Sequence, residues 1–231
     1  MLREIAIKLQ GGCLQINPKS GLKKTPGQQN KFDCMKTGLI KYYLARFWMW
    51  LFGWTIAGDL PPDKKFVLIA APHTSNWDFL FGLATVYVLR LKIFWIGKHT
   101  LFKAPFGYFM KRLGGIPVRR DAAHGLVKQI ISQLQNSDNF IIAVAPSGTR
   151  KKAECWKSGF YRIACKAHIP LVCGYLDYSR KQAGSGLSFL PTGNITADMD
   201  RIRQFYQGIQ GKYPDQVTPV RLMDEDGLRS L

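Results

Sequence analysis

From about residue 60 onward, short apolar runs alternate with longer stretches of helical periodicity, and this alternation limits the chain to few fold classes. Short apolar runs bounded by turn residues are typical of buried strands. Strands that alternate with helices predict the α/β class, here with a largely parallel central sheet flanked by helices. We expect strands at 66–71, 92–97, 116–118, 140–145, 171–178 and 187–191, and helices at 77–89, 104–114, 122–136, 155–168 and 198–209.

The stretch "APHTSNWDFLFG", residues 71–82, carries polar side chains directly after the first predicted strand. His73 and Asp78 would diverge by about 140° on a continuous helix, so they can meet only if the chain bends between them. Pro72 ends the strand, and Ser75 and Asn76 favour a helix start. The sequence therefore predicts His73 on a loop and Asp78 in a first helical turn. Taken singly, Asp78 could serve the helix dipole and His73 could be solvated.

The chain is strongly basic and has few signs of a metal or disulfide framework. It has 33 lysines and arginines against 15 acids, giving a formal net charge of +18 among 231 residues. Such a balance implies a polyanionic partner: nucleic acid, an anionic membrane surface or phosphorylated substrates. No nucleic-acid-binding motif accompanies it, so we expect no nucleic acid. The five cysteines lack CxxC spacing and do not cluster with histidines, which favours free thiols and no metal site.

Two segments precede the alternating region. Residues 1–36 are polar and rich in Gly, Lys and Gln, and we expect a basic, mobile arm. Residues 37–58 contain "LIKYYLARFWMWLFGWTIAG", in which Lys41 and Arg46 interrupt an aromatic-rich apolar stretch. Its uninterrupted part is shorter than the roughly 20 residues that a spanning helix needs. Aromatic segments flanked by cations suit the headgroup boundary, so we favour a membrane-interface helix over a span or a helix packed on the domain.

Two further motifs follow predicted strands and contain groups that suit anions. "GGIPVRR", 114–120, ends in paired arginines, and "PSGTR", 146–150, combines a glycine, a hydroxyl and an arginine. Loop amides and guanidinium groups bind phosphate oxygens. Each motif also has a simpler reading, a solvated surface for the arginines and a plain turn for Gly148.

The order of four motifs resembles the glycerolipid acyltransferases, closest to the 1-acylglycerol-3-phosphate (lysophosphatidic acid) type with its H-x4-D motif. The matching stretches are "HTSNWD" (73–78), "KHTLFKAPFGYFMKRLGGIPVRR" (98–120), "VAPSGTR" (144–150) and "IPLV" (169–172). The resemblance implies that residues 59–231 form an acyltransferase catalytic domain. It also implies a membrane-associated enzyme at the cytoplasmic face that makes phosphatidic acid from membrane lipids and needs no cofactor beyond acyl-CoA or acyl carrier protein as donor.

The resemblance also assigns roles to individual residues. His73 matches the general base and Asp78 the carboxylate that orients it. The substrate-binding positions match Arg120, Gly148, Thr149 and Arg150, and Pro170 belongs to the fourth motif, which shapes the site. Ser147 departs from the family pattern, which has Glu there. That departure keeps two alternatives open: an acceptor without a phosphate, or an inactive membrane-surface lipid-binding protein.

Overall fold

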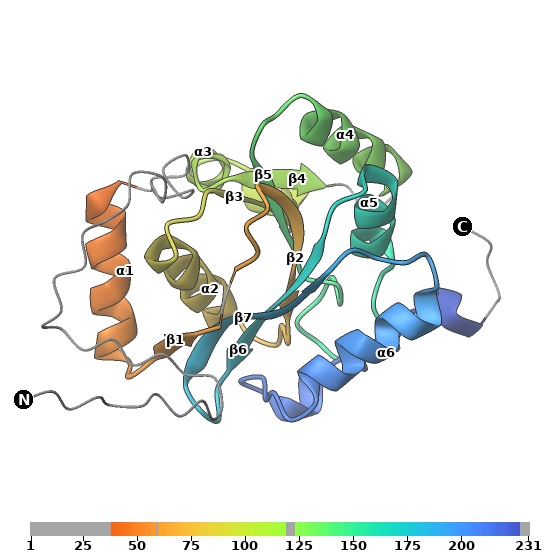
Figure 1. Cartoon of the computed structure of the whole chain (residues 1–231). Helices are drawn as coiled ribbons and strands as arrows, with labels where there is room; N and C mark the ends of the chain where they lie inside the picture. The colour runs from red at the N-terminus through yellow and green to blue at the C-terminus, as the bar shows by residue number, and fades with distance from the viewer. Residues whose placement is uncertain (1–37, 59, 119–122, 227–231) are drawn as a thin grey trace, which may run out of the picture. The chain divides into compact units, whose positions relative to one another are not determined.

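The computed structural model describes residues 38–58, 60–118 and 123–226. The predicted basic arm, 1–36, and the predicted substrate-binding residue Arg120 lie outside the described residues. The described part of the chain forms a mixed sheet between two layers of helices (Figure 1), so the predicted fold class is confirmed.

The described part of the sheet has seven strands in the order β1-β7-β6-β2-β5-β3-β4. Their bounds are β1 Thr55–Ala57, β2 Lys65–Ala71, β3 Ile93–Lys98, β4 Gly115–Val118, β5 Phe140–Val144, β6 Leu171–Asp177 and β7 Gln182–Phe189. All neighbouring pairs are parallel except β6 with β7. Strands β2 to β6 therefore end at one common edge of the sheet.

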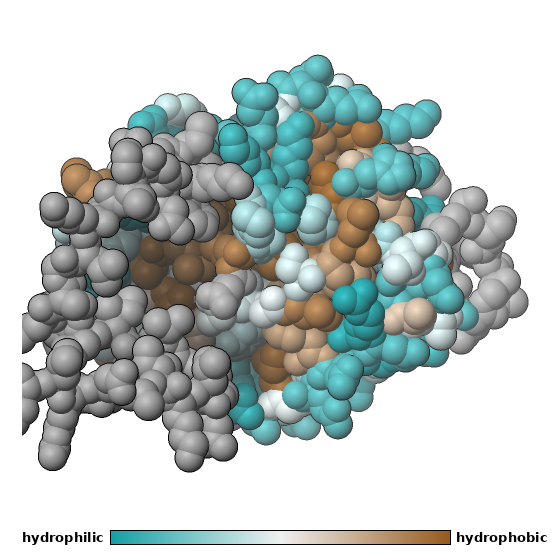
Figure 2. All heavy atoms as spheres, in the orientation of Figure 1, coloured by the Kyte–Doolittle hydropathy of each residue, from teal (hydrophilic) through white to brown (hydrophobic). Residues whose placement is uncertain are grey.

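Two sets of helices cover the two faces of the sheet. Helices α1 (Leu39–Leu51) and α2 (Trp77–Val88) pack on one face, and α4 (Ala123–Gln135), α5 (Gly159–Ala167) and α6 (Ile195–Tyr206) on the other. The short elements are α3 (Phe106–Arg112) and the 3-10 turns η1 (His99–Phe102), η3 (Pro214–Gln216) and η4 (Met223–Asp226). Figure 2 shows hydrophilic side chains over α4 and α6, with apolar side chains between them.

Strand β2 supplies side chains to both faces because successive residues of a strand point in opposite directions. Val67 and Ile69 enter the larger core beneath α4, α5 and α6. Phe66 packs with Val86 of α2 on the other face. Val67, Ile69 and Phe66 are at most 1% exposed, and burial of each contributes about 1.5–3 kcal/mol. This double burial explains why the strand reads as a continuous apolar run.

Helix α1 is shorter than the predicted helix over 37–58, so that prediction is wrong for the residues after Leu51. It ends at Leu51, Gly53 takes a positive φ of 67°, and Trp54 enters the core. The chain then forms strand β1, which pairs with the distant β7. The buried face of α1 holds Ala45 and Met49 and packs on α2, while its other face is exposed. None of the helices in the described ranges is long and apolar enough to cross a bilayer.

Strand β7 begins earlier than the predicted 187–191, at Gln182. Its first half, "QAGSG", looks like a loop because glycines weaken isolated strands. The structure supplies the reason for Gly184: a Cβ there would lie 1.7 Å from the carbonyl oxygen of Ala57 in β1. The close approach of these two strands therefore requires a glycine.

Candidate active site

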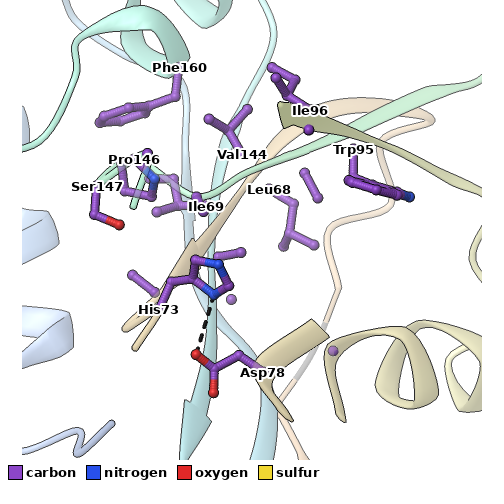
Figure 3. A pocket seen from close by; sticks show the side chains of 18 of the residues that line it. Leu68, Ile69, His73, Asp78, Trp95, Ile96, Val144, Pro146, Ser147 and Phe160 are labelled. Atoms are coloured by element: carbon purple, nitrogen blue, oxygen red, sulfur yellow. Dashed lines mark ion pairs between the residues drawn. The ribbon is translucent and has the colours of Figure 1, made fainter. Parts of the chain in front are cut away.

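The loops that follow three parallel strands meet at the common edge of the sheet. His73 follows β2, the loop 146–150 follows β5, and Tyr178 follows β6. Carboxyl ends of parallel strands are where α/β sheets place their ligand sites. His73, Asp78 and the 147–150 segment all line one cavity (Figure 3).

The predicted bend brings His73 and Asp78 together. Helix α2 begins at Trp77, which places Asp78 in its first turn, and His73 lies on the preceding loop. His73 Nδ1 lies 3.3 Å from Asp78 Oδ2, and the two side chains are 28% and 4% exposed. In Figure 3 the other ring nitrogen points away from Asp78 and toward the cavity. The geometry is that of an imidazole held at one nitrogen and available at the other.

The carboxylate of Asp78 also holds the loop itself. Its Oδ2 accepts hydrogen bonds from the backbone N–H groups of Thr74 at 2.7 Å and Ser75 at 2.8 Å. Asn76, at the N-cap position, makes no side-chain capping bond, and Ser75 Oγ accepts from the Trp77 N–H instead. The bend predicted from the sequence is therefore stabilised chiefly by Asp78.

Asp78 is ionised despite its burial. Burial opposes the charged form, but hydrogen bonds from His73, Tyr178 and the Ser75 N–H outweigh it, and the pKa of Asp78 lies below its usual range. A negative charge beside His73 favours an imidazole that directs its Nδ1–H at Asp78. Nε2 then carries the lone pair that a general base needs.

The loop after β5 forms a tight turn. Gly148 has a φ of +61°, and its N–H donates to the Ala145 carbonyl at 3.0 Å. The Ser147 hydroxyl is buried and donates to the Thr149 carbonyl at 2.8 Å. Lys157 Nζ lies close to Gly148, within 3.3 Å of where a Cβ would stand. The turn leaves Arg150 exposed at the cavity.

The cavity has a volume of about 1720 Å³, larger than the 300–1,000 Å³ of pockets for drug-sized ligands. Much of its lining is apolar and comes from α2, β2 and β3, including Leu68, Leu83, Val86, Ile93 and Trp95. Its described charged lining is mainly basic: Lys98, Lys128, Arg150, Lys157, Arg162 and Lys166 against Asp78 and Glu154. Such a site suits a ligand with a long apolar part and an anionic part.

Two predicted positions stand apart from this group. Val118, the last residue of β4, lines the cavity, but Arg120 lies outside the described residues. Pro170 is not among the residues that line the cavity, and the part of the fourth motif in shaping the site stays a prediction. Pro170 immediately precedes β6 and so lies at the amino end of that strand. Its carbonyl accepts a hydrogen bond from the Val67 N–H, near the start of β2. The carboxyl end of β6 reaches the site instead.

Tyr178 and the lysines that line the cavity were not predicted from the sequence as site residues. Tyr178 Oη donates to Asp78 Oδ1 at 2.7 Å from one hundred positions away in the chain. Its place at the carboxyl end of the predicted strand 171–178 was the one available signal. Among the described residues, no group of three or more His, Cys, Asp or Glu side chains could hold a metal ion.

Comparison with known proteins identifies the family of this chain. A family model described as Acyltransferase matches residues 54–176, more than half of the chain. The chain belongs to the acyltransferase family. Among solved structures it is similar to the 1-acyl-sn-glycerophosphate (LPA) acyltransferase PlsC from Thermotoga maritima, at 19% identity and a TM-score of 0.47, over 67% of this chain and 69% of that one. A search of curated proteins finds no match.

Proposed function

We propose that the protein is a lysophospholipid O-acyltransferase. It moves an acyl group from acyl-CoA or acyl carrier protein to the free hydroxyl of 1-acylglycerol-3-phosphate and gives phosphatidic acid. The observation that carries the proposal is the His73–Asp78 pair, which presents an imidazole to a large cavity with an apolar interior and basic residues. Membership of the acyltransferase family supports it.

The arrangement suits direct transfer without an acyl-enzyme. His73 Nε2 takes the proton of the acceptor hydroxyl as the oxygen attacks the thioester carbonyl. A new C–O ester bond forms and the C–S bond breaks, and the proton then passes from His73 to the departing thiolate. Asp78 holds the imidazole in the orientation that this proton transfer requires.

The charges and the apolar lining suit the two ends of the substrates. The acyl chain occupies the apolar region between α2 and β3, lined by Leu83, Val86 and Ile93. Arg150 and Lys157 lie at the turn after β5, where they favour the phosphate of the acceptor. Phosphate binding at this turn would place the acceptor within reach of His73, which lines the same cavity.

The exposed surface supports a membrane-surface location. Helix α1 exposes seven apolar or aromatic side chains: Leu39, Ile40, Tyr43, Leu44, Phe47, Trp50 and Leu51. A second exposed apolar surface lies on η1 and α3, made of Leu101, Phe106, Tyr108 and Phe109. Lys103, Lys111 and Arg112 accompany it, and no acid occurs between residues 98 and 118. Aromatic side chains among cations suit an anionic lipid surface, and we propose that both surfaces contact it.

The test uses the purified full chain and measures acyl transfer to lysolipids in vesicles. The donors are acyl-CoA and acyl carrier protein, each carrying a labelled acyl group. We expect labelled phosphatidic acid from lysophosphatidic acid. Folded protein that binds the vesicles but transfers to none of a panel of lysolipids would contradict the proposal. That result would support the alternative of an inactive lipid-binding protein.

Ser147 motivates a second candidate, an acceptor without a phosphate. Where the family pattern has Glu, the buried Ser147 hydroxyl bonds to the Thr149 carbonyl and supplies no charge. Under our main proposal, Ser147→Glu weakens the apparent affinity for lysophosphatidic acid, because it places a negative charge in the Arg150 turn. A zwitterionic lysolipid serves as the control acceptor. A several-fold gain of turnover with lysophosphatidic acid in Ser147→Glu would favour the second candidate.

A further inference from the structure

Each oxygen of the buried Asp78 carboxylate has its own set of partners. Oδ2 faces His73 Nδ1 and accepts the N–H groups of Thr74 and Ser75. Oδ1 accepts the hydroxyl of Tyr178 at 2.7 Å. The carboxylate could otherwise turn about its Cβ–Cγ bond and change the oxygen presented to His73. A donor on Oδ1 opposes that rotation.

The position of the Tyr178 hydroxyl is set by packing that does not involve Asp78. The ring lies edge-on to Trp54, with centroids 4.9 Å apart, and edge-on to Phe81 at 6.2 Å. The backbone N–H of Tyr178 donates to the Gln210 carbonyl at 2.9 Å. Tyr178 is therefore held at the ring and at the backbone, and its hydroxyl is a fixed donor.

The hydroxyl keeps its proton over the working pH range. Burial raises the pKa of Tyr178, and the hydrogen bond to Asp78 and the charge of that carboxylate raise it further. The tyrosine therefore donates to Asp78 and does not compete with His73 as a base.

We propose that Tyr178 is a positioning residue for acyl transfer, whose hydroxyl holds the Asp78 carboxylate with Oδ2 directed at His73 Nδ1. The role rests on the proposed function, because it acts through the His73–Asp78 pair. It also gives β6 a part in the site: the strand that starts after Pro170 ends next to Tyr178. Its carboxyl end, and not the fourth motif itself, supplies the side chain that reaches Asp78.

The test is Tyr178→Phe, which removes the hydroxyl and keeps the ring between Trp54 and Phe81. We expect kcat to fall about tenfold, the order that losing one hydrogen bond to a buried charge produces. The KM values for donor and acceptor should change less than about twofold, because Tyr178 touches neither substrate in this scheme. Unfolding curves give the folded fraction of each variant, so that kcat is compared for folded protein.

Tyr161→Phe is the matched control. Tyr161 Oη donates to Asp198 Oδ2 at 2.8 Å, and Tyr161 is fully buried in the core and is not among the residues that line the cavity. This variant loses the same kind of hydrogen bond. We expect lower stability with an unchanged kcat per folded molecule.

A double-mutant cycle separates this inference from the proposed function. In an Asp78→Asn background, Tyr178→Phe should lower kcat no further, because its route to His73 is already lost. An unchanged kcat in Asp78→Asn alone would overturn the catalytic pair itself. Two other outcomes would overturn only the role of Tyr178, provided that Asp78→Asn lowers kcat. In the first, Tyr178→Phe leaves kcat unchanged. In the second, the losses of kcat in the two single variants multiply in the double variant.

Discussion

Asp78 and Asp198 are buried aspartates on helices that cover opposite faces of the sheet. Each lies in the first turn of its helix and accepts a hydrogen bond from a tyrosine hydroxyl, Tyr178 or Tyr161. Each also accepts backbone N–H groups from the segment before the helix, Thr192 N–H in the case of Asp198. Up to this point the two carboxylates are built alike.

The two regions differ in what else the carboxylate touches. Asp78 faces an imidazole beside a basic cavity, whereas Asp198 bonds the Thr192 hydroxyl in addition to Tyr161. On both faces of the sheet, a carboxylate at the start of a helix thus accepts hydrogen bonds from a tyrosine and from the backbone, and so stabilises the local structure. Burial and hydrogen bonding of an aspartate therefore do not indicate a catalytic site by themselves. Asp78 is set apart from Asp198 by the adjacent His73 and by the cavity that His73 and Asp78 line.

Removing His73 should have the largest effect. His73→Ala deletes the base, and we expect kcat to fall about 10²–10⁴-fold. Folding should persist, because the side chain is 28% exposed on a loop. His168→Asn is the control: His168 is an exposed residue at the end of α5 with a φ of +50°, which Asn tolerates. Near wild-type turnover in His73→Ala would refute the assignment of the base.

Exchanging the two aspartates for asparagine tests the comparison directly. Asp78→Asn should lower kcat about 10²-fold or more, because the imidazole loses the partner that sets its orientation. Asp198→Asn should instead lower the free energy of unfolding by about 1–3 kcal/mol and leave kcat per folded molecule unchanged. Activity assays with denaturant unfolding measure both quantities. Equal effects on kcat from the two variants would break the distinction between the regions.

The exposed side of α1 should also contribute more to lipid binding than an exposed apolar residue outside the surfaces proposed to contact the membrane. Phe47 and Trp50 of α1 are 57% and 73% exposed, and replacing both with Gln removes apolar area from the proposed membrane surface. We expect the partition coefficient onto vesicles containing anionic phospholipid to fall about tenfold. Leu190→Gln is the matched control, since Leu190 is 54% exposed and belongs to neither of the two surfaces that we propose to contact lipid. Flotation that is equally weakened by the control would argue against a specific surface.

The smallest expected effect concerns stability in acid. The pKa of Asp78 is lowered in the folded protein. Its carboxylate therefore stabilises the fold at any pH above the ordinary aspartate pKa, which is near 3.9. That contribution is lost as the pH falls through the lowered pKa. The wild type should therefore lose stability below about pH 4 relative to Asp78→Asn. Urea unfolding at a series of pH values from neutral to acid measures the difference, and parallel curves for the two proteins would contradict it.

The sequence was most informative where local pattern and tertiary structure agree. The apolar run before Pro72 and the helix-start residues after it predicted β2, α2 and the bend that joins His73 to Asp78. The α/β class followed from the same alternation repeated along the chain. These features depend on neighbouring residues, so periodicity and turn chemistry were sufficient to predict them.

Features set by distant contacts were not predictable in the same way. Strand β1 and the start of β7 exist because Gly184 allows the Ala57 carbonyl to approach, and no local pattern records that contact. The end of α1 at Leu51 likewise follows from the burial of Trp54. Tyr178 reaches Asp78 through sheet order, because β6 lies beside β2. Reading the chain in one dimension cannot supply that adjacency.

The aromatic packing of α1 has a consequence for how the enzyme would meet its substrates. Trp48 of α1 stacks with Trp77 of α2, their centroids 6.3 Å apart, and Trp77 immediately precedes Asp78. If α1 rests on the bilayer as proposed, the catalytic pair sits at a fixed height above the lipid and accepts lysolipid by lateral diffusion within the leaflet. Turnover would then follow the mole fraction of acceptor in the surface, and diluting that surface with inert lipid would slow the reaction at constant bulk concentration.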